Sequence, residues 1–385
     1  MTIEGVVAPG YETVREAFAE NFTGNSDIGA AVAVYRDGKS VVDLWGGSAD
    51  TERDRPWQRD TMTLVYSATK GVLAVAAHLL AQRGELDLDA PVIEYWPEFG
   101  AAGKQRIPVR WLLSHRAGLP ALDRPVPVLD TLNWDPMVDA LAAQRPLWEP
   151  GSAHGYHGRT FGWLVGEVVR RVSGRSPGQF VAEEIAAPLG ADFYIGLPDS
   201  ERDRVARLAF TPPPDFAAID IDSVPEEMRP MVVAAKDPNS LYHRAFQVTD
   251  PPDMDFNSVE VQAAQIPSSN GIGTARGLAR IYASLIGEVD GVRLLTSETR
   301  TAATREQSAG TDQVLAMPTR FGSGFMLPTP TMPLTGPTTF GHPGRGGSLA
   351  FADPDRGLAF AYVTDHIIEG ALDTRASSLL AAVPS

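Results

Sequence analysis

The chain has 385 residues, enough for one large domain or two closely joined domains with a substantial core. Its formal net charge of −15 argues against nucleic acids and anionic membrane surfaces as partners. The absence of cysteine excludes disulfides, a cysteine nucleophile and thiolate metal sites. The 43% hydrophobic and 21% charged residues are typical of an ordinary soluble globular protein.

The N-terminal residues 1–5 carry neither a basic segment nor a long apolar one, so we expect no signal peptide. No stretch reaches the roughly 20 consecutive apolar residues that a membrane span needs. We therefore expect a cytoplasmic protein without membrane contact.

The first elements are a helix and a hairpin. Apolar side chains recur at helical spacing in residues 10–25, and residues 28–35 read as a strand. An Asp-Gly turn at 37–38 leads to a second strand at 40–47, which is typical of a β-hairpin. Residues 48–63 are polar, and we expect them to be irregular.

Helical patterns broken by proline and glycine dominate residues 87–200. We expect a short helix that starts within 107–115 and ends at Gly118, a helix at 161–172 with Ser173-Gly174 as its end, and a helix at 177–187.

Residues 198–270 differ, because prolines cluster there among scattered apolar residues. The segment reads as a long, ordered but irregular excursion. Such a segment is either a lid or pocket wall, or a peripheral insertion, and the sequence leaves both open.

Strand patterns return near the C-terminus. We expect helices at 274–285 and 371–382, and strands at 321–327, 338–340, 348–352 and 358–364.

Strands thus lie at both ends of the chain and helices in its middle. The simplest arrangement is an α+β fold, in which one antiparallel sheet is built from both chain ends and flanked by helices. We expect residues 1–65 and 270–385 to form this α/β domain. Residues 66–269 then form an inserted, mainly helical domain.

The stretch Ser67-Ala68-Thr69-Lys70 opens an apolar helical pattern that lasts to Gln82. Lys70 follows Ser67 by three positions, so a first helical turn places both side chains on one face. A serine hydroxyl needs a neighbouring base to become a nucleophile, and a lysine serves if burial lowers its pKa. The N-terminus of the helix also offers backbone N–H groups to an oxyanion.

Alone, this tetrapeptide fits a helix-capping serine beside a solvated lysine better than it fits a nucleophile. Two features favour the catalytic interpretation. The chain has only four lysines, and Lys70 lies between the apolar segments 64–66 and 72–75. A lysine in such surroundings is expected to be buried.

A second candidate is Tyr156, on the glycine-rich, aromatic segment 150–162 just before a helix. A tyrosine there can share a proton with a lysine, or it can be a buried tyrosine whose hydroxyl is hydrogen-bonded. His154 and His157 lie nearby, but no carboxylate-rich segment accompanies them. We therefore expect no metal site.

A third candidate is the glycine-rich segment 341–348, which precedes a strand. Its glycines allow close approach of the backbone, so a strand edge passing the serine can donate a second N–H to an oxyanion. A tight turn into the strand is the alternative. The segment is not a dinucleotide fingerprint, because no helix follows it.

Together, the three elements resemble the serine hydrolases of the class C β-lactamase and penicillin-binding-protein superfamily. The resemblance covers residues 15–380 and places the elements in the order of that family. The connecting segments are also similar, including Leu112-Leu113-Ser114-His115 with Gly118-Leu119, Pro150-Gly151, Ser173-Gly174 and residues 267–281.

The resemblance implies the β-lactamase/transpeptidase-like fold and a mechanism without a cofactor. Ser67 would be the nucleophile, and Lys70 with Tyr156 would activate it and pass the proton to the leaving group. The N–H groups of Ser67 and Arg345 would form the oxyanion hole, with Gly344 beside them in the substrate site. An acyl-enzyme would form and then be hydrolysed.

Two positions depart from the β-lactamases of this class. Gly158 stands where they have asparagine, and His342 stands where the late triplet has lysine. Both missing groups handle the amide and the carboxylate of a β-lactam. With Gly158 and His342 in the substrate site, the chain is more similar to the family VIII carboxylesterases.

We therefore expect hydrolysis of small carboxylic esters with short to medium acyl groups. Alternatives are an acyltransferase that uses the same acyl-enzyme, a weak β-lactamase or D-amino-peptide hydrolase, and a binding protein without turnover. The oligomeric state is not predicted.

Overall fold

The computed structural model describes residues 2–24, 27–212, 215, 218–252, 254–332, 334–368 and 373–384. Within them, a seven-stranded antiparallel sheet runs in the order β1-β3-β2-β15-β14-β13, with β4 paired to β3. Its strands are β1 (Ile3–Val7), β2 (Gly29–Arg36), β3 (Lys39–Asp50), β4 (Arg55–Pro56), β13 (Phe340–Pro343), β14 (Leu349–Asp353) and β15 (Leu358–Thr364).

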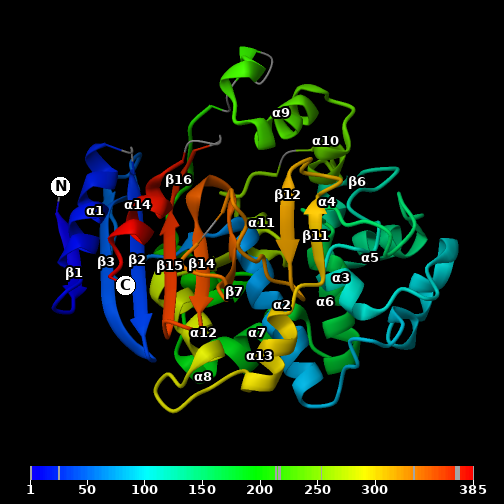
Figure 1. The fold of residues 1–385 in the computed structure, drawn as a ribbon, viewed down its shortest axis with the longest axis horizontal. Coiled ribbons are helices and arrows are strands. Elements are labelled where there is room, and N and C mark those ends of the chain that lie inside the picture. The colour runs from blue at the N-terminus through cyan, green and yellow to red at the C-terminus, as the bar shows by residue number, and fades with distance from the viewer. Residues whose placement is uncertain are drawn as a thin grey trace.

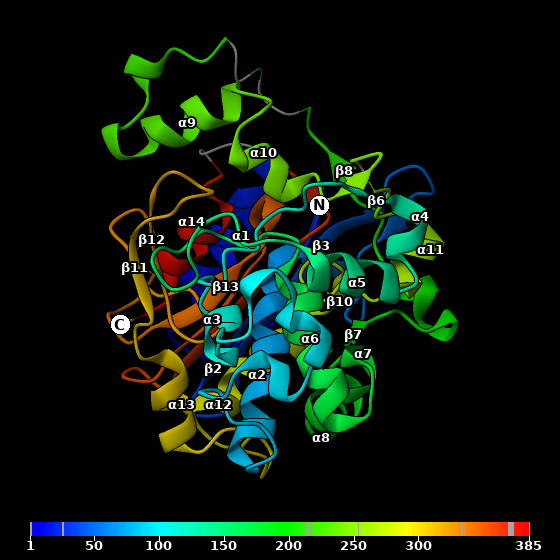
Figure 2. The same cartoon turned by 90° about the vertical axis from the view of Figure 1, so that its right-hand side faces the viewer.

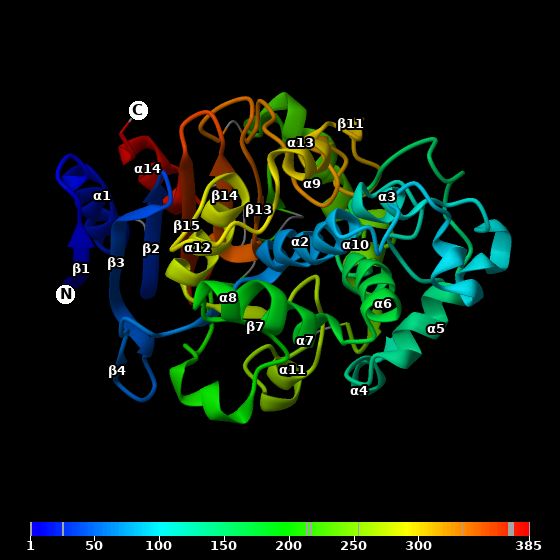
Figure 3. The same cartoon turned by 90° about the horizontal axis from the view of Figure 1, so that it is seen from below.

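Helices cover both faces of this sheet (Figures 1 and 3). The terminal helices α1 (Glu12–Thr23) and α14 (Arg375–Ala382) pack together on one face, and α12 (Ala275–Ile286) covers the other. The predicted α+β fold, with one antiparallel sheet built from both chain ends and flanked by helices, is confirmed.

Alternation along the central strands explains why both faces are filled. On β2, Val32 and Val34 belong to the apolar cluster under the terminal helices, whereas Ala31 and Ala33 face the larger core that includes α12. Successive strand residues point to opposite faces, so the two alanines face α12 and the two valines face α1 and α14. Because both faces are buried, the strand reads as one continuous apolar run.

The helix α2 (Thr69–Gln82) lies between the sheet layer and the helical part of the molecule (Figures 1 and 3). Its residues 69–80 are all buried, which accounts for its almost uniformly apolar sequence. It packs against α6 (Phe161–Ser173), which ends as predicted at Gly174 with a φ of 69°. The other helices are α3 (Val109–Leu113), α4 (Val128–Thr131), α5 (Asp135–Ala143), α7 (Pro177–Val181), α8 (Ala187–Leu189), α9 (Arg229–Lys236), α10 (Leu241–Phe246), α11 (Val259–Ala263) and α13 (Ser297–Thr304).

A second small sheet supports the start of α2. It has the order β5-β10-β7, and its middle strand pairs with both neighbours in antiparallel register. The remaining short strands form two-stranded pairs. The bounds are β5 (Thr63–Leu64), β6 (Val126–Pro127), β7 (Phe193–Ile195), β8 (Ala209–Phe210), β9 (Thr249–Asp250), β10 (Gly271–Gly273), β11 (Ser308–Thr311), β12 (Pro318–Phe321) and β16 (His366–Ile367).

The strand expected at 321–327 is wrong. β12 ends at Phe321, and the chain then turns through Gly322 and Gly324. Gly324 has a φ of 89°, and its N–H donates to the Leu113 carbonyl at 3.0 Å. Phe325 and Leu327, which suggested a strand, are buried after this turn instead.

The edge strand β1 was not predicted, because it is short and Gly5 interrupts its pattern. A Cβ at Gly5 would lie 2.0 Å from the Asp43 carbonyl oxygen, so the glycine permits the pairing with β3. The region 48–63 is less irregular than expected, since β3 extends to Asp50 and β4 follows. Residues 371–372 of the expected last helix lie outside the described residues. The division into two domains stays a prediction.

Candidate active site

Ser67 lies in a tight 3-10 turn, Tyr66–Ala68, between β5 and α2. Tyr66, the residue before it, adopts a φ of 47°, a left-handed conformation that costs energy in a side-chain-bearing residue. Thr69 holds the turn, because its Oγ1 donates to the Tyr66 carbonyl at 2.5 Å and accepts the Gly271 N–H at 2.9 Å. Ser67 is partly exposed at the end of this turn.

Lys70 lies beneath Ser67 with its side chain fully buried, as the sequence predicts. Its Nζ is 3.0 Å from Ser67 Oγ, 2.8 Å from the Gly158 carbonyl oxygen and 2.9 Å from the Ser268 carbonyl oxygen. Burial, assisted by the charge of Arg159, lowers the pKa of Lys70 well below its usual value of 10.5. The solvated-lysine alternative is therefore excluded.

Tyr156 lies on the segment before α6, with its backbone N–H donating to Asp312 Oδ1 at 2.9 Å. Its ring centroid is 4.9 Å from Lys70 Nζ, and its hydroxyl is hydrogen-bonded to the side chain of Ser67. Burial raises the pKa of the Tyr156 phenol, and the nearby Asp312 carboxylate acts in the same direction. The phenol is therefore held in its neutral, proton-carrying form.

The third predicted element passes beside this turn. The His342 ring centroid is 5.9 Å from that of Tyr156. A Cβ built on Gly344 would lie 2.2 Å from the Val65 carbonyl oxygen, so the glycine allows the strand end to lie against the turn that carries Ser67. The guanidinium of Arg345 lies 5.8 Å from the Tyr66 ring centroid.

All seven predicted site residues therefore gather in one region, namely Ser67, Lys70, Tyr156, Gly158, His342, Gly344 and Arg345.

His342 is neutral in this arrangement. Burial and the proximity of Lys70 lower the pKa of the imidazole to about 3. Its Nδ1 lies 2.7 Å from the Pro343 carbonyl oxygen, which assigns the proton to Nδ1 and leaves Nε2 as an acceptor. A neutral ring at this position cannot replace the charge of a lysine.

Two neighbouring histidines, His154 and His157, form hydrogen bonds with segments around the site. His157 Nδ1 donates to the Gly155 carbonyl at 2.7 Å, and its Nε2 accepts the Leu119 N–H at 2.9 Å. His154 Nε2 is hydrogen-bonded to Thr319 Oγ1. Within the described residues, no group of three or more His, Asp and Glu side chains is placed to hold a metal ion.

Three residues of this region had no predicted role. His115 belongs to the quoted Leu-Leu-Ser-His run, and its ring lies 5.1 Å from that of Tyr156. The Asp312 carboxylate accepts hydrogen bonds from the backbone N–H groups of Tyr156, Val314 and Leu315. Phe246, from the proline-rich excursion, packs 6.3 Å from the Tyr156 ring. No local pattern marks Asp312 or Phe246.

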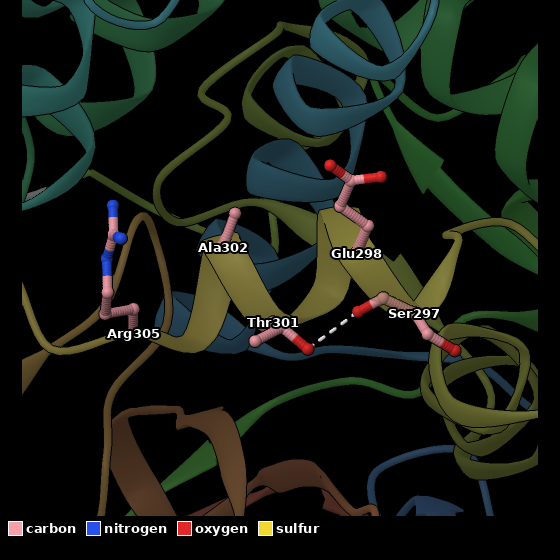
Figure 4. A pocket seen from close by; sticks show the side chains of 5 residues that line it. All are labelled: Ser297, Glu298, Thr301, Ala302 and Arg305. Atoms are coloured by element: carbon pink, nitrogen blue, oxygen red, sulfur yellow. Dashed lines mark hydrogen bonds between the residues drawn. The ribbon is translucent and has the colours of Figure 1, made fainter.

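A separate surface hollow lies on α13 (Figure 4). It is lined by Ser297, Glu298, Thr301, Ala302 and Arg305, and includes none of the predicted site residues. The Thr301 hydroxyl donates to the Ser297 carbonyl at 2.7 Å, an ordinary contact within the helix. Ser297 thus offers a serine outside the Ser67 region for comparison.

Comparison with known proteins agrees with this geometry. The family model described as Beta-lactamase matches residues 16–377. The chain belongs to the β-lactamase family. The predicted β-lactamase-like serine hydrolase is thereby confirmed at the level of the family.

Members of this family similar to the chain include an esterase. The chain is 37% identical over 374 residues to the esterase/β-lactamase LipL of Mycobacterium tuberculosis, covering 94% of this chain and 83% of LipL. A family VIII carboxylesterase structure shares 38% identity and a TM-score of 0.85, with 99% of both chains covered. A penicillin-binding-protein homologue from Caulobacter crescentus shares 38% identity and a TM-score of 0.86 over both whole chains.

None of the helices in the part of the chain that the structure describes has the length and apolar character required to cross a bilayer.

Proposed function

We propose that the chain is a carboxylesterase, which cleaves esters of short to medium acyl groups through an acyl-enzyme on Ser67. The observation that carries this proposal is the buried Lys70 amine, held 3.0 Å from the Ser67 hydroxyl by two backbone carbonyls. The ester as substrate is supported by the relatives named as esterases.

Lys70 is the general base for Ser67. A neutral amine has two N–H groups and one lone pair, and two carbonyl oxygens, of Gly158 and Ser268, accept the two N–H groups. The lone pair is then directed at the remaining neighbour, the Ser67 hydroxyl. The lowered pKa of Lys70 favours the neutral amine, which can take the proton of the serine.

Tyr156 passes the proton to the leaving group. Its raised pKa keeps the phenol protonated, so Tyr156 acts as a donor rather than as the base. Ser67 Oγ forms a bond to the ester carbonyl carbon, the bond to the alcohol oxygen breaks, and Tyr156 gives that oxygen a proton. Lys70 returns the proton of the serine to Tyr156. The acyl group then remains on Ser67.

The oxyanion is held by the backbone N–H groups of Ser67 and Arg345. The approach of Gly344 to the Val65 carbonyl supports this assignment, because it brings the backbone before Arg345 beside the turn of Ser67. In the second half of the reaction, water attacks the acyl carbon and gives its proton to the Lys70 and Tyr156 pair. Ser67 leaves with a proton, and the acid is released.

The residues that differ from a β-lactamase favour an uncharged ester. Gly158 has no side chain to hydrogen-bond an amide, and the neutral His342 has no charge to pair with a carboxylate. A β-lactam would therefore lose two of its expected contacts here. Ester hydrolysis needs only the nucleophile, the proton donors and the oxyanion hole.

A series of p-nitrophenyl esters tests the proposal with wild type, Ser67→Ala and the control Ser297→Ala. We expect wild type and Ser297→Ala to hydrolyse acetate and butyrate esters equally, and Ser67→Ala to lose at least about 10³ in kcat. Hydrolysis of nitrocefin reports β-lactamase activity. In parallel ester assays, an added alcohol acceptor reports acyltransferase activity.

Full activity of Ser67→Ala would remove Ser67 as the nucleophile. Rapid nitrocefin hydrolysis without cleavage of any ester would replace the esterase proposal by a β-lactamase. Slow hydrolysis that gives way to ester products on addition of the alcohol would favour the acyltransferase.

A further inference from the structure

The proline-rich excursion 198–270 carries α9 and α10, which form the green part above the rest of the molecule in Figures 1 and 2. In both views α10 lies closer to the body of the protein than α9. The two interpretations left open by the sequence differ in what α10 contacts, because a peripheral insertion would not contact the site.

The end of α10 packs on the site through a small apolar cluster, separate from the two larger cores. The Phe246 ring lies 6.3 Å from the Tyr156 ring and 5.4 Å from the Tyr242 ring. Phe246 remains partly exposed, so one part of its ring is left for a ligand. The cluster consists of Tyr156, Ala245, Val314 and Phe321, with Leu241, Phe246, Leu315 and Met326 packed against them.

The same ring occupies the space that a side chain at position 158 would need. A Cβ built on Gly158 would lie 2.5 Å from Phe246 Cε1 and 3.0 Å from its Cδ1 and Cζ. The φ of Gly158 lies outside the left-handed region, so its backbone alone would accept other residues. A side chain at position 158 is thus opposed by the Phe246 ring rather than by the backbone conformation of Gly158.

The carbonyl of Gly158 is also a hydrogen-bond acceptor of Lys70. Phe246 therefore lies against Gly158, whose carbonyl accepts a hydrogen bond from the proposed base Lys70. Its ring also packs against that of the proposed proton donor, Tyr156. A substrate group beside Tyr156 and Gly158 meets an apolar aromatic wall there.

We propose that Phe246 is the specificity-determining residue of this site, because its ring limits the bulk of the ester group that lies beside Tyr156 and Gly158. This inference rests on the proposed esterase function. The substrates selected are esters whose group at this wall is apolar and narrow, such as an unbranched chain. An ester with a branched or aromatic group at this wall is accepted only when the Phe246 ring is removed.

The test compares Phe246→Ala and Phe246→Leu with wild type on two ester series. One series varies the acyl group from acetate to pivalate, and the other varies the alcohol from a linear to a bulky aromatic one. We expect the bulky-to-narrow ratio of kcat/KM to rise at least about tenfold in one series for Phe246→Ala, and less for Phe246→Leu. The series that responds identifies the group at the wall.

Val233→Ala is the matched control, because Val233 lies on α9 of the same excursion and is 52% exposed. Its ratios should equal those of wild type. Unchanged ratios in both series for an active Phe246→Ala, or an equal change in Val233→Ala, would overturn the inference.

A double-mutant cycle adds an independent test. Gly158→Ala alone should lower kcat/KM for narrow esters, because the new methyl group displaces the Phe246 ring and disturbs the Lys70 acceptor. In the Phe246→Ala background the same change should cost much less. Additive effects would contradict the contact.

Failure of the proposed function has a different readout. In that case p-nitrophenyl acetate is not hydrolysed by wild type, whereas failure of the inference shows as unchanged ratios in active proteins.

Discussion

Two buried lysines, Lys70 and Lys104, differ in what surrounds the amine, and only Lys70 is proposed to act in catalysis. Both side chains have no exposed surface, and each Nζ donates to two backbone carbonyls. Lys104 binds the carbonyls of Ala142 and Gln144, at the C-terminal end of α5, where a lysine stabilises carbonyls without intrahelical partners.

The difference lies in the third neighbour. Lys70 has the Ser67 hydroxyl at 3.0 Å and the Tyr156 ring at 4.9 Å, whereas the Lys104 amine lies 5.2 Å from the Phe99 ring. Burial lowers both pKa values, that of Lys104 to about 8. Burial alone therefore does not distinguish the two lysines, and the adjacent hydroxyl and phenol are what mark Lys70 as the proposed base.

The largest expected contrast comes from Lys70→Met and Lys104→Met. Both changes leave two carbonyls without a donor, and each such loss costs about 1–3 kcal/mol of stability. Only Lys70→Met should also lower kcat, by at least ~10². Thermal unfolding and p-nitrophenyl butyrate kinetics measure the two effects. Equal kcat losses in both variants would remove the distinction.

A matched pair of tyrosines sharpens the comparison next. Tyr156→Phe should lower kcat by at least ~10², because the ring contacts remain and only the proton donor is lost. Tyr282 is the control, since its hydroxyl is also buried and lies against Gly71, the residue after Lys70. Tyr282→Phe should retain kcat within about threefold. A similar loss in the two variants would show that packing, not proton transfer, explains the effect.

The pH dependence of activity should report Lys70 alone. The base must be neutral, so kcat/KM falls as pH drops through the lowered pKa of Lys70, well below 10.5. Lys104→Met should keep the same acidic limb as wild type, because Lys104 does not contact the serine. If the acidic fall of kcat/KM shifted in Lys104→Met, its assignment to Lys70 would be contradicted. A pH profile of kcat/KM for the two proteins is the measurement.

The smallest effect concerns stability and Lys104. Its folded pKa of about 8 lies below the ordinary 10.5, so between these pH values the unfolded chain binds more protons. Lys104 should therefore add to the free energy of unfolding as pH rises across this window, beside the contribution of Lys70, whose pKa is also lowered. Lys104→Met should show a smaller increment than wild type in urea titrations at pH 7 and pH 10. An identical increment in both proteins would assign it to another group.

The local pattern of the sequence was enough to predict that Ser67 and Lys70 lie together. Ser67 and Lys70 share one helical turn, so their spacing alone places them together. The strand alternation and the Asp-Gly turn likewise predicted the β2–β3 hairpin. These features depend on neighbours along the chain.

Features that depend on contacts between distant segments were not predictable. Phe246 reaches Gly158 from the proline-rich excursion, and Asp312 holds the Tyr156 backbone from the loop between β11 and β12. Neither residue lies in a pattern that marks its partner. The edge strand β1 was missed because its pairing with β3 depends on the close approach at Gly5.

The most direct test of the central claim is mass spectrometry of the protein quenched during hydrolysis of p-nitrophenyl butyrate. We expect one butyryl group on the intact protein, mapped to the peptide that contains Ser67 and absent from Ser67→Ala. A butyryl group on another residue, or equal labelling of Ser67→Ala, would contradict an acyl-enzyme on Ser67.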